Sequence, residues 1–176
     1  MPARAFLLAM LFSSSVFAQR TQAPDVIYVP TPYEVVDAML KLADVKKGDV
    51  LYDLGSGDGR IPVTAAKKFG IRAVGVDIDP QRIEEAKENA KKNGVARLVE
   101  FRNEDLFRTP FGEATVVTLY LLPDLNVKLR PRLLAELKPG TRVVSHQFDM
   151  GTWKPDRKVE LNGRTIYLWT IPPRKR

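Results

Sequence analysis

Short apolar runs alternate with amphipathic runs along most of the chain. The apolar runs are rich in Val, Leu and Ala and end in turns, which is typical of strands buried on both faces of a sheet. The runs between them repeat apolar residues at helical spacing. This order predicts an α/β fold with a mostly parallel sheet. The predicted strands cover residues 50–54, 73–77, 98–102, 114–122 and 141–148, and the predicted helices cover residues 32–43, 61–69, 80–93 and 124–137.

The last part of the chain has the pattern of a β-hairpin instead of another strand and helix. Residues 157–161 and 165–170 flank Asn162-Gly163, a dipeptide that favours a tight hairpin turn. Two local details complete the prediction. Thr31 and Glu34 have the spacing of a capping box at the start of the first helix, and Pro131 is expected to kink or split the fourth.

The first residues do not share this alternation. Arg4, a short apolar run over 5–12 and the sequence Val16-Phe17-Ala18 have the pattern of a secretory signal peptide cleaved after Ala18. An uncleaved anchor is the alternative, although the run is shorter than the ~20 residues that span a bilayer. We expect a leader over 1–18, a linker over 19–30, one domain over 31–171 and a basic tail over 172–176. The leader predicts export to the periplasm or membrane association, and a cytoplasmic location if it is not used.

Composition and charge narrow the classes of partner. With 176 residues, 44% of them hydrophobic and 28% charged, the chain is long enough for one globular domain with a core. The net charge of +7 permits an acidic partner, but the basic residues are scattered, which favours a plain basic surface over a nucleic-acid site. The chain has no Cys and a single His, so neither a cysteine site nor a histidine cluster can hold a metal, and no metal is predicted.

The candidate site begins where the first predicted strand ends. Asp53 lies in that strand, and Gly55, Gly57 and Gly59 follow at alternate positions with Asp58 between the last two. Glycines permit tight loops and a close approach of a ligand to the backbone. The carboxylates would repel a pyrophosphate but suit a ligand that carries a sulfonium and an ammonium, as S-adenosylmethionine does. A nucleotide site and a plain glycine-rich turn are the alternatives.

Three further residues are expected around the same ligand. Asp77 ends the second strand at the same edge of the sheet, where an acid can accept hydrogen bonds from both ribose hydroxyls of a nucleoside. Asp105 follows the third strand and is expected to accept from the exocyclic amine of adenine, with capping of its own loop as the alternative. Tyr28 precedes the first helix and is expected near the ligand, unless it only packs against that helix.

Tyr120 and His146 are the candidate catalytic residues, because they lie near the ends of the fourth and fifth predicted strands. Either could orient a reacting group or relay its proton through water, and ordinary packing is the alternative.

From Tyr28 to Ile171 the chain resembles the class I, seven-strand S-adenosylmethionine-dependent methyltransferases. The resemblance is carried by the D-x-G-x-G-x-G loop from Asp53 to Gly59, by Asp77 and Asp105, and by the Leu137-Lys138-Pro139-Gly140 turn. Within that class, Tyr28-Val29-Pro30-Thr31-Pro32 and Val143-Val144-Ser145-His146 resemble the archaeal broad-specificity protein-lysine methyltransferase and its mitochondrial lysine methyltransferase relatives.

The resemblance implies a Rossmann-like seven-strand sheet, mostly parallel with a C-terminal antiparallel hairpin. It also implies methyl transfer from S-adenosylmethionine to an exposed lysine of a protein substrate, where Tyr120 or His146 would orient the acceptor amine, with nucleic acid an unlikely partner. The stretch from Thr118 to Pro123 agrees with this, because it lacks the Asn/Asp-Pro-Pro-aromatic motif of enzymes that methylate planar amines, and an aliphatic amine suits an apolar channel with an aromatic wall better. Two other classes stay open. One is a small-molecule or nucleic-acid methyltransferase with the same cofactor site, and the other is a non-catalytic nucleoside-binding protein.

Overall fold

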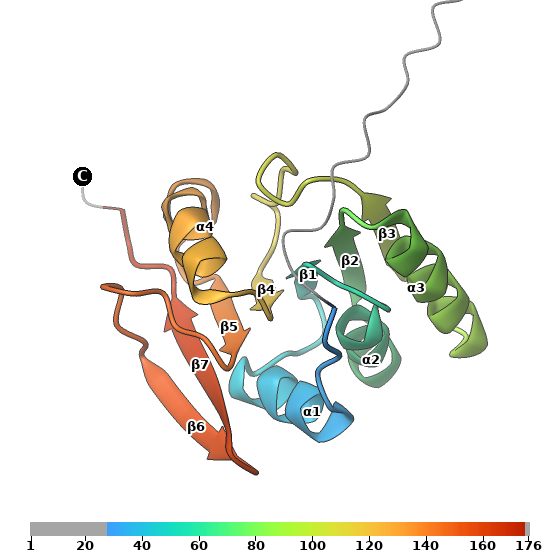
Figure 1. Cartoon of the computed structure of the whole chain (residues 1–176), viewed down its shortest axis with the longest axis horizontal. Helices are drawn as coiled ribbons and strands as arrows, with labels where there is room; N and C mark the ends of the chain where they lie inside the picture. The colour runs from blue at the N-terminus through green and yellow to red at the C-terminus, as the bar shows by residue number, and fades with distance from the viewer. Residues whose placement is uncertain (1–27, 175–176) are drawn as a thin grey trace, which may run out of the picture.

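A computed structural model describes residues 28–174, which form a seven-stranded sheet flanked by helices (Figure 1). The strand order is β3-β2-β1-β4-β5-β7-β6. The strands are β1 (Val50–Leu54), β2 (Arg72–Asp77), β3 (Val99–Asn103), β4 (Val116–Leu119), β5 (Arg142–His146), β6 (Arg157–Leu161) and β7 (Arg164–Thr170). The helices are α1 (Tyr33–Leu42), α2 (Arg60–Phe69), α3 (Pro80–Lys92) and α4 (Pro123–Glu136).

The first five strands are parallel, and the last two are antiparallel. β1 pairs in parallel with β2 and β4, and β3 and β5 extend the sheet on either side. β7 then pairs antiparallel with β5 and with β6. The predicted fold class, a mostly parallel Rossmann-like sheet with a C-terminal hairpin, is therefore confirmed. The parallel pairing brings the carboxyl ends of β1 to β5 to one edge of the sheet, where ligands bind in folds of this kind.

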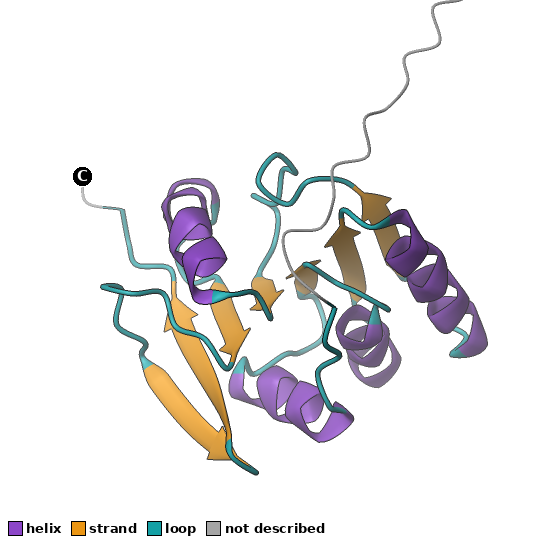
Figure 2. Ribbon diagram, in the orientation of Figure 1, coloured by secondary structure: helices purple, strands orange, loops and turns teal. Residues whose placement is uncertain are grey.

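Each face of the sheet has its own apolar core, because successive residues of a strand point to opposite faces. In β1, Leu51 packs with α1, α2 and α3, whereas Tyr52 and Leu54 pack with α4. Figure 2 shows the same division, with α4 across the sheet from the other three helices. Both faces of the parallel strands are therefore covered, and the loops at the strand ends are the part of the sheet left to bind a ligand.

The predicted hairpin turn is confirmed, and α3 has the cap and the ion pairs that its sequence favours. The Asp79 carboxylate accepts from Gln81 N–H at 2.8 Å and caps α3, with Pro80 in the first turn. Asn162 and Gly163 both have positive φ, 50° and 73°, as the tight hairpin turn requires. The exposed pairs Glu84–Lys87 and Glu88–Lys92 form at helical spacing on α3.

Other local predictions are wrong. The capping box at Thr31 does not form: α1 begins at Tyr33 with Pro32 as N-cap, because the Thr31 hydroxyl pairs with the His146 ring instead. Pro131 does not split α4, which continues to Glu136 with Pro131 inside it, and the alternative that Pro131 kinks the helix stays a prediction. β4 and β5 are shorter than predicted: the apolar run after β4 continues into a loop, and β5 ends at His146 because Gln147 has a φ of 70° and turns the chain.

The predicted leader over 1–18, most of the linker and the last two residues of the tail lie outside the described residues. The assignments of leader, export and membrane association stay predictions. Within residues 28–174, no helix has the length and apolar character that crossing a lipid bilayer requires.

Candidate active site

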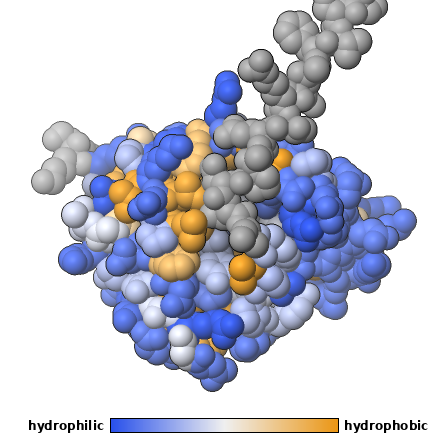
Figure 3. Space-filling model, viewed as in Figure 1, coloured by the Kyte–Doolittle hydropathy of each residue, from blue (hydrophilic) through white to orange (hydrophobic). Residues whose placement is uncertain are grey.

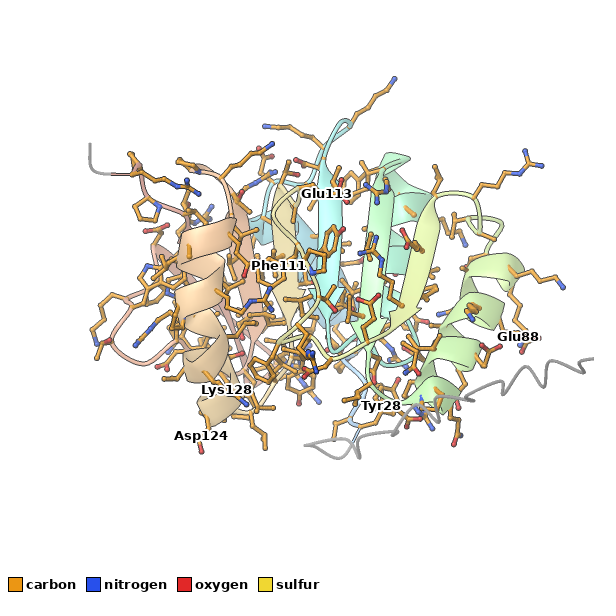
Figure 4. The ribbon with its side chains drawn as sticks, turned by 90° about the horizontal axis from the view of Figure 1, so that it is seen from above. Tyr28, Glu88, Phe111, Glu113, Asp124 and Lys128 are labelled. Atoms are coloured by element: carbon orange, nitrogen blue, oxygen red, sulfur yellow. The ribbon has the colours of Figure 1, made fainter. Side chains whose placement is uncertain are left out.

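A cavity of about 310 Å³ opens at the carboxyl edge of the sheet. Its walls come from the loops after β1, β2, β3 and β4 and from residues 28–31, which precede α1. Figure 4 shows Tyr28 and Asp124 at this edge and Glu113 at the opposite one. Of the predicted site residues, the ones that line the cavity are Tyr28, Asp53, Gly55, Asp58, Asp77, Asp105 and Tyr120.

The glycine loop that forms the floor of the cavity requires its glycines. Gly55, Gly57 and Gly59 have φ values of 86°, 52° and 73°, in the left-handed region that side chains disfavour. Space is also short, because a Cβ at Gly57 would overlap the ring of Tyr28. A Cβ at Gly59 would lie 2.5 Å from Cζ of Phe101. The predicted need for glycine at this loop is therefore both conformational and steric.

Asp77 fixes the shape of this loop. Its Oδ2 accepts from Gly57 N–H at 2.8 Å, and its Oδ1 accepts from Asp79 N–H at 3.0 Å. Each carboxylate oxygen can accept more than one hydrogen bond, so these contacts leave acceptor capacity toward the cavity that Asp77 lines. The same carboxylate can thus hold the loop and receive a ligand hydroxyl.

Asp53 and Asp58 differ in their charge state. Asp53 is 2% exposed, and burial raises its pKa to about 8 even though the Thr118 hydroxyl donates to it at 2.7 Å. Burial also opposes ionisation of Asp58, but Arg60 lowers the pKa of Asp58 through two contacts of 2.9 and 2.6 Å. A cation bound near Asp53 would replace the solvation that this carboxyl group lacks.

Two arginines fasten the segment over the cavity. The Arg82 guanidinium lies 4.7 Å from the centre of the Tyr28 ring, and Arg60 Nη1 donates to the Thr31 carbonyl at 2.9 Å. Burial and the Asp58 charge raise the pKa of Tyr28, which therefore keeps its proton at neutral pH. Sequence reasoning missed both arginines, because a pairing between an arginine on α2 or α3 and the segment before α1 leaves no local pattern.

Asp105 has a local role in addition to its place in the cavity wall. Its Oδ1 accepts from Phe107 N–H at 2.8 Å and so caps the loop after β3. Leu106 and Phe107 on this loop also line the cavity. The two interpretations of Asp105, loop cap and ligand contact, are therefore compatible, and the contact with adenine stays a prediction.

The wall contains more acid than base. Asp53, Asp58, Asp77, Asp79 and Asp105 contribute carboxyl groups, against the guanidinium groups of Arg60 and Arg82. Both guanidiniums are already paired with carboxylates, Arg60 with Asp58 and Arg82 with Glu85. The cavity therefore favours a ligand with positive charge. Among residues 28–174, no group of three or more acidic or histidine side chains is arranged to hold a metal ion.

An aromatic cluster closes the β4 side of the cavity. Tyr120 lines the cavity, and its ring centre lies 4.0 Å from that of His146 and 6.3 Å from that of Phe148. His146 itself is 1% exposed and does not line the cavity. Its Nδ1 pairs with the Thr31 hydroxyl at 3.2 Å, and burial together with the charge of Arg164 lowers its pKa to about 4. Tyr120 thus faces the cavity and neutral His146 lies behind it, and the catalytic role of either residue stays a prediction.

Comparison with known proteins assigns this architecture to a family. Residues 53–157, more than half of the chain, match the family model of the ANTKMT methyltransferase domain. The chain is 47% identical over 157 residues to a protein-lysine N-methyltransferase of Saccharolobus islandicus, covering 86% of this chain and 98% of the relative. It is 36% identical over 137 residues to the adenine nucleotide translocase lysine N-methyltransferase of Mus musculus, covering 77% of this chain and 58% of that protein.

A solved structure agrees in fold. The chain is 62% identical to an RNA methyltransferase from Salinibacter ruber in complex with S-adenosyl-L-homocysteine, with a TM-score of 0.82 over 84% of this chain and 97% of that one. The resemblance found in the glycine loop and the strand-end acids is confirmed. The match over residues 53–157 and the 47% identity to nearly all of the archaeal protein show that the chain belongs to the ANTKMT methyltransferase family.

Proposed function

We propose that the protein methylates lysine side chains of proteins, with S-adenosylmethionine as methyl donor. One observation carries this proposal: the 47% identity to the archaeal protein-lysine N-methyltransferase extends over 98% of that protein. The chain is a methyltransferase by family, and S-adenosylmethionine is its cofactor, as the S-adenosyl-L-homocysteine in the 62% identical structure supports. The choice of lysine as acceptor is the part that requires a test.

The residues of the cavity fit this cofactor. The excess of carboxyl groups suits the sulfonium and the ammonium, and buried Asp53 lies close to two further acids, Asp58 and Asp77. Asp77 retains acceptor capacity for ribose hydroxyls. Ile78, Leu106 and Phe107 provide an apolar wall of the kind that an adenine ring packs against.

The acceptor end of the cavity suits an aliphatic amine. In the reaction, the lysine nitrogen forms a bond to the methyl carbon while the carbon–sulfur bond breaks, and the electron pair of that bond stays on sulfur. A free lysine with a pKa near 10.4 is only about 0.04% neutral at pH 7, so it must first lose a proton. Apolar surroundings near Tyr120 lower the lysine pKa, and the Tyr120 hydroxyl can accept a hydrogen bond from the amine.

RNA is the second candidate substrate, because the 62% identical structure is that of an RNA methyltransferase. The charges at the site argue against it. Five carboxyl groups line the cavity; burial raises the pKa of Asp53 to about 8 and Asp58 is paired with Arg60, so the acidic groups left to face a phosphate are mainly those of Asp77, Asp79 and Asp105. Phosphate groups approaching this wall would meet repulsion in place of the lysines and arginines that usually neutralise them.

The surrounding face is mostly hydrophilic, with hydrophobic residues gathered beside α4, where Leu122, Val127 and Leu134 are exposed (Figure 3).

A labelling experiment separates the two substrates. The purified protein is incubated with radiolabelled S-adenosylmethionine and an extract of the source organism, and the products are treated with protease or with ribonuclease. We expect label that protease removes and ribonuclease leaves. Asp77→Ala, assayed at limiting S-adenosylmethionine, serves as the low-activity control, since it removes the predicted ribose contact. Label that only ribonuclease removes would replace the lysine proposal with the RNA one.

A further inference from the structure

The chain reverses direction sharply where β5 ends. Gln147 has a φ of 70°, and the N–H of Phe148 donates to the carbonyl of His146 at 2.9 Å. A hydrogen bond across three residues with a positive φ at the middle one is a γ-turn of the rarer hand, which is strained for a residue with a side chain. All other described residues with positive φ are Gly, Asn or Asp, which tolerate this conformation.

Two neighbouring elements hold this turn in place. From β7, Thr165 accepts from Gln147 N–H at 2.6 Å and donates its own N–H to Gln147 Oε1 at 3.2 Å. From α4, the fully buried Asn126 donates through Nδ2 to the carbonyls of Phe148 and Asp149, each at 3.2 Å. A strained turn persists only where its surroundings fix it, and here the side chains of Asn126 and Gln147 do so.

The turn determines where the aromatic cluster lies. His146 and Phe148 are its first and third residues, and both rings contact Tyr120. Tyr120 in turn lines the cavity. A shift of the turn would therefore move two of the rings that fix the Tyr120 side chain. Asp77 and the glycine loop that it holds belong to β2 and to the end of β1, two or more strands away from β5 in the sheet.

We propose that Asn126 and Gln147 are positioning residues for the methyl acceptor. They hold the γ-turn in its strained form, and the turn fixes the Tyr120 ring at the end of the cavity where the acceptor amine enters. The identification of that acceptor as lysine rests on the proposed function. Because methyl transfer requires the amine in line with the breaking bond, a small displacement of this wall slows the reaction without weakening the binding of the cofactor.

Two substitutions test the proposal from different sides. Asn126→Asp keeps the shape of the side chain but replaces the amide donor that faces two carbonyls. Gln147→Gly permits the positive φ without strain and removes the acceptor of the Thr165 N–H. For each variant we expect kcat/KM for the acceptor to fall by roughly tenfold or more, because small misplacements of reacting groups have effects of this order. The dissociation constant of S-adenosylmethionine, measured by calorimetry, is expected to stay within about twofold of the wild-type value.

Matched variants distinguish positioning from a general loss of structure. Gln147→Glu keeps both the strained backbone and an oxygen that can accept from Thr165, so it is expected to retain most of the activity. Thr115→Val removes hydrogen bonds to Val50 and Asp49 at the opposite edge of the sheet and should lower the melting temperature with no change in acceptor KM. If Asn126→Asp fails to fold, Gln147→Gly still tests the positioning role. Relief of strain should keep or raise the melting temperature of Gln147→Gly, while its activity falls.

The outcomes bear separately on the two proposals. Wild-type protein is first assayed on protein and RNA acceptors, and the variants are then compared on whichever acceptor it methylates. Unchanged acceptor kinetics in both variants, or losses matched by an equal loss of cofactor affinity, would overturn the positioning roles. Methylation of RNA by the wild type would overturn the lysine assignment alone.

Discussion

The two ends of the cavity are built in different ways. The cofactor end is local: Asp53, the three glycines and Asp77 come from one strand–loop–helix–strand stretch, and Asp77 bonds directly to the loop. The acceptor end is assembled from distant parts of the chain. Thr31 pairs with His146, 115 residues away, and Asn126 reaches from α4 to the turn after β5.

This difference shows which properties follow from local sequence. The glycine loop follows from local sequence because its left-handed φ values require glycine and because Asp77, one strand further on, holds Gly57 N–H. The aromatic wall around Tyr120 is held by contacts from α4, β5, β7 and the segment before α1. A substitution in any of these elements can therefore move the wall. The cofactor end therefore follows from one local stretch of sequence, whereas the acceptor end depends on contacts between distant parts of the chain.

The largest expected effect tests the rigidity of the cofactor end. Gly59 and Gly163 share a φ of 73°, but a Cβ at Gly59 would meet Phe101 and Ala86, whereas one at Gly163 would meet nothing within 4 Å. Gly59→Ala is expected to lower the free energy of unfolding by about 2–4 kcal/mol, from overpacking plus left-handed strain. Gly163→Ala, the control, should lose only about 1–2 kcal/mol, from strain alone. Urea unfolding measures both, and equal losses would show that the loop has room to adjust.

The next prediction concerns the cofactor itself. Asp77→Ala removes charged acceptors for ribose hydroxyls and also frees Gly57 N–H. We expect the binding free energy of S-adenosylmethionine to weaken by about 1.5–3 kcal/mol in calorimetry. Glu84→Ala, on the exposed face of α3, is the control. Affinity that stays at the wild-type value in Asp77→Ala would remove this residue from the cofactor site.

The acceptor end should respond to acid. Burial lowers the pKa of His146 to about 4, below its ordinary value of 6.5. The unfolded chain takes up a proton on His146 as pH falls through 6.5, whereas the folded chain does not. The contribution of neutral His146 to the free energy of unfolding is therefore complete above pH 6.5 and is lost as pH falls toward 4. At pH 5 the loss is about 2 kcal/mol relative to pH 7.5. His146→Phe should lack this part of the pH dependence, and parallel stability curves for the two proteins would contradict the burial of a neutral His146.

The smallest expected effect isolates the Tyr120 hydroxyl. Tyr120→Phe keeps the ring that contacts His146 and Phe148 and removes only the acceptor for the amine. Turnover should fall by about three- to tenfold, the range of one hydrogen bond of about 1 kcal/mol, with the cofactor affinity unchanged. Tyr120→Ala, which opens the wall, should lower both. Equal turnover in Tyr120→Phe and wild type would limit Tyr120 to a packing role.

The fold and the cofactor end were predictable from the sequence, because both depend on periodicity and on a local motif. The local details that failed depend on the rest of the fold. Thr31 has the sequence context of a helix cap, but its hydroxyl pairs with a histidine from the far side of the chain. The position of the turn at Gln147 could not be predicted either, since no local rule places Gln at a φ of 70°. One local sign of a contact within the site was Thr118, a polar residue inside the apolar fourth strand, whose hydroxyl donates to Asp53.

Chemical identification of the methylated product tests the assignment of lysine as the acceptor most directly. Protein labelled with radioactive methyl groups is hydrolysed to amino acids, and the labelled species are separated. We expect methyl-lysines, formed faster as pH rises from about 7 toward 9 because the neutral amine is the nucleophile. Replacement of the acceptor lysine by arginine should abolish the label, since guanidinium stays protonated. Label recovered as methyl-arginine, methyl-glutamine, an alkali-labile ester or a methylated nucleotide would contradict the assignment.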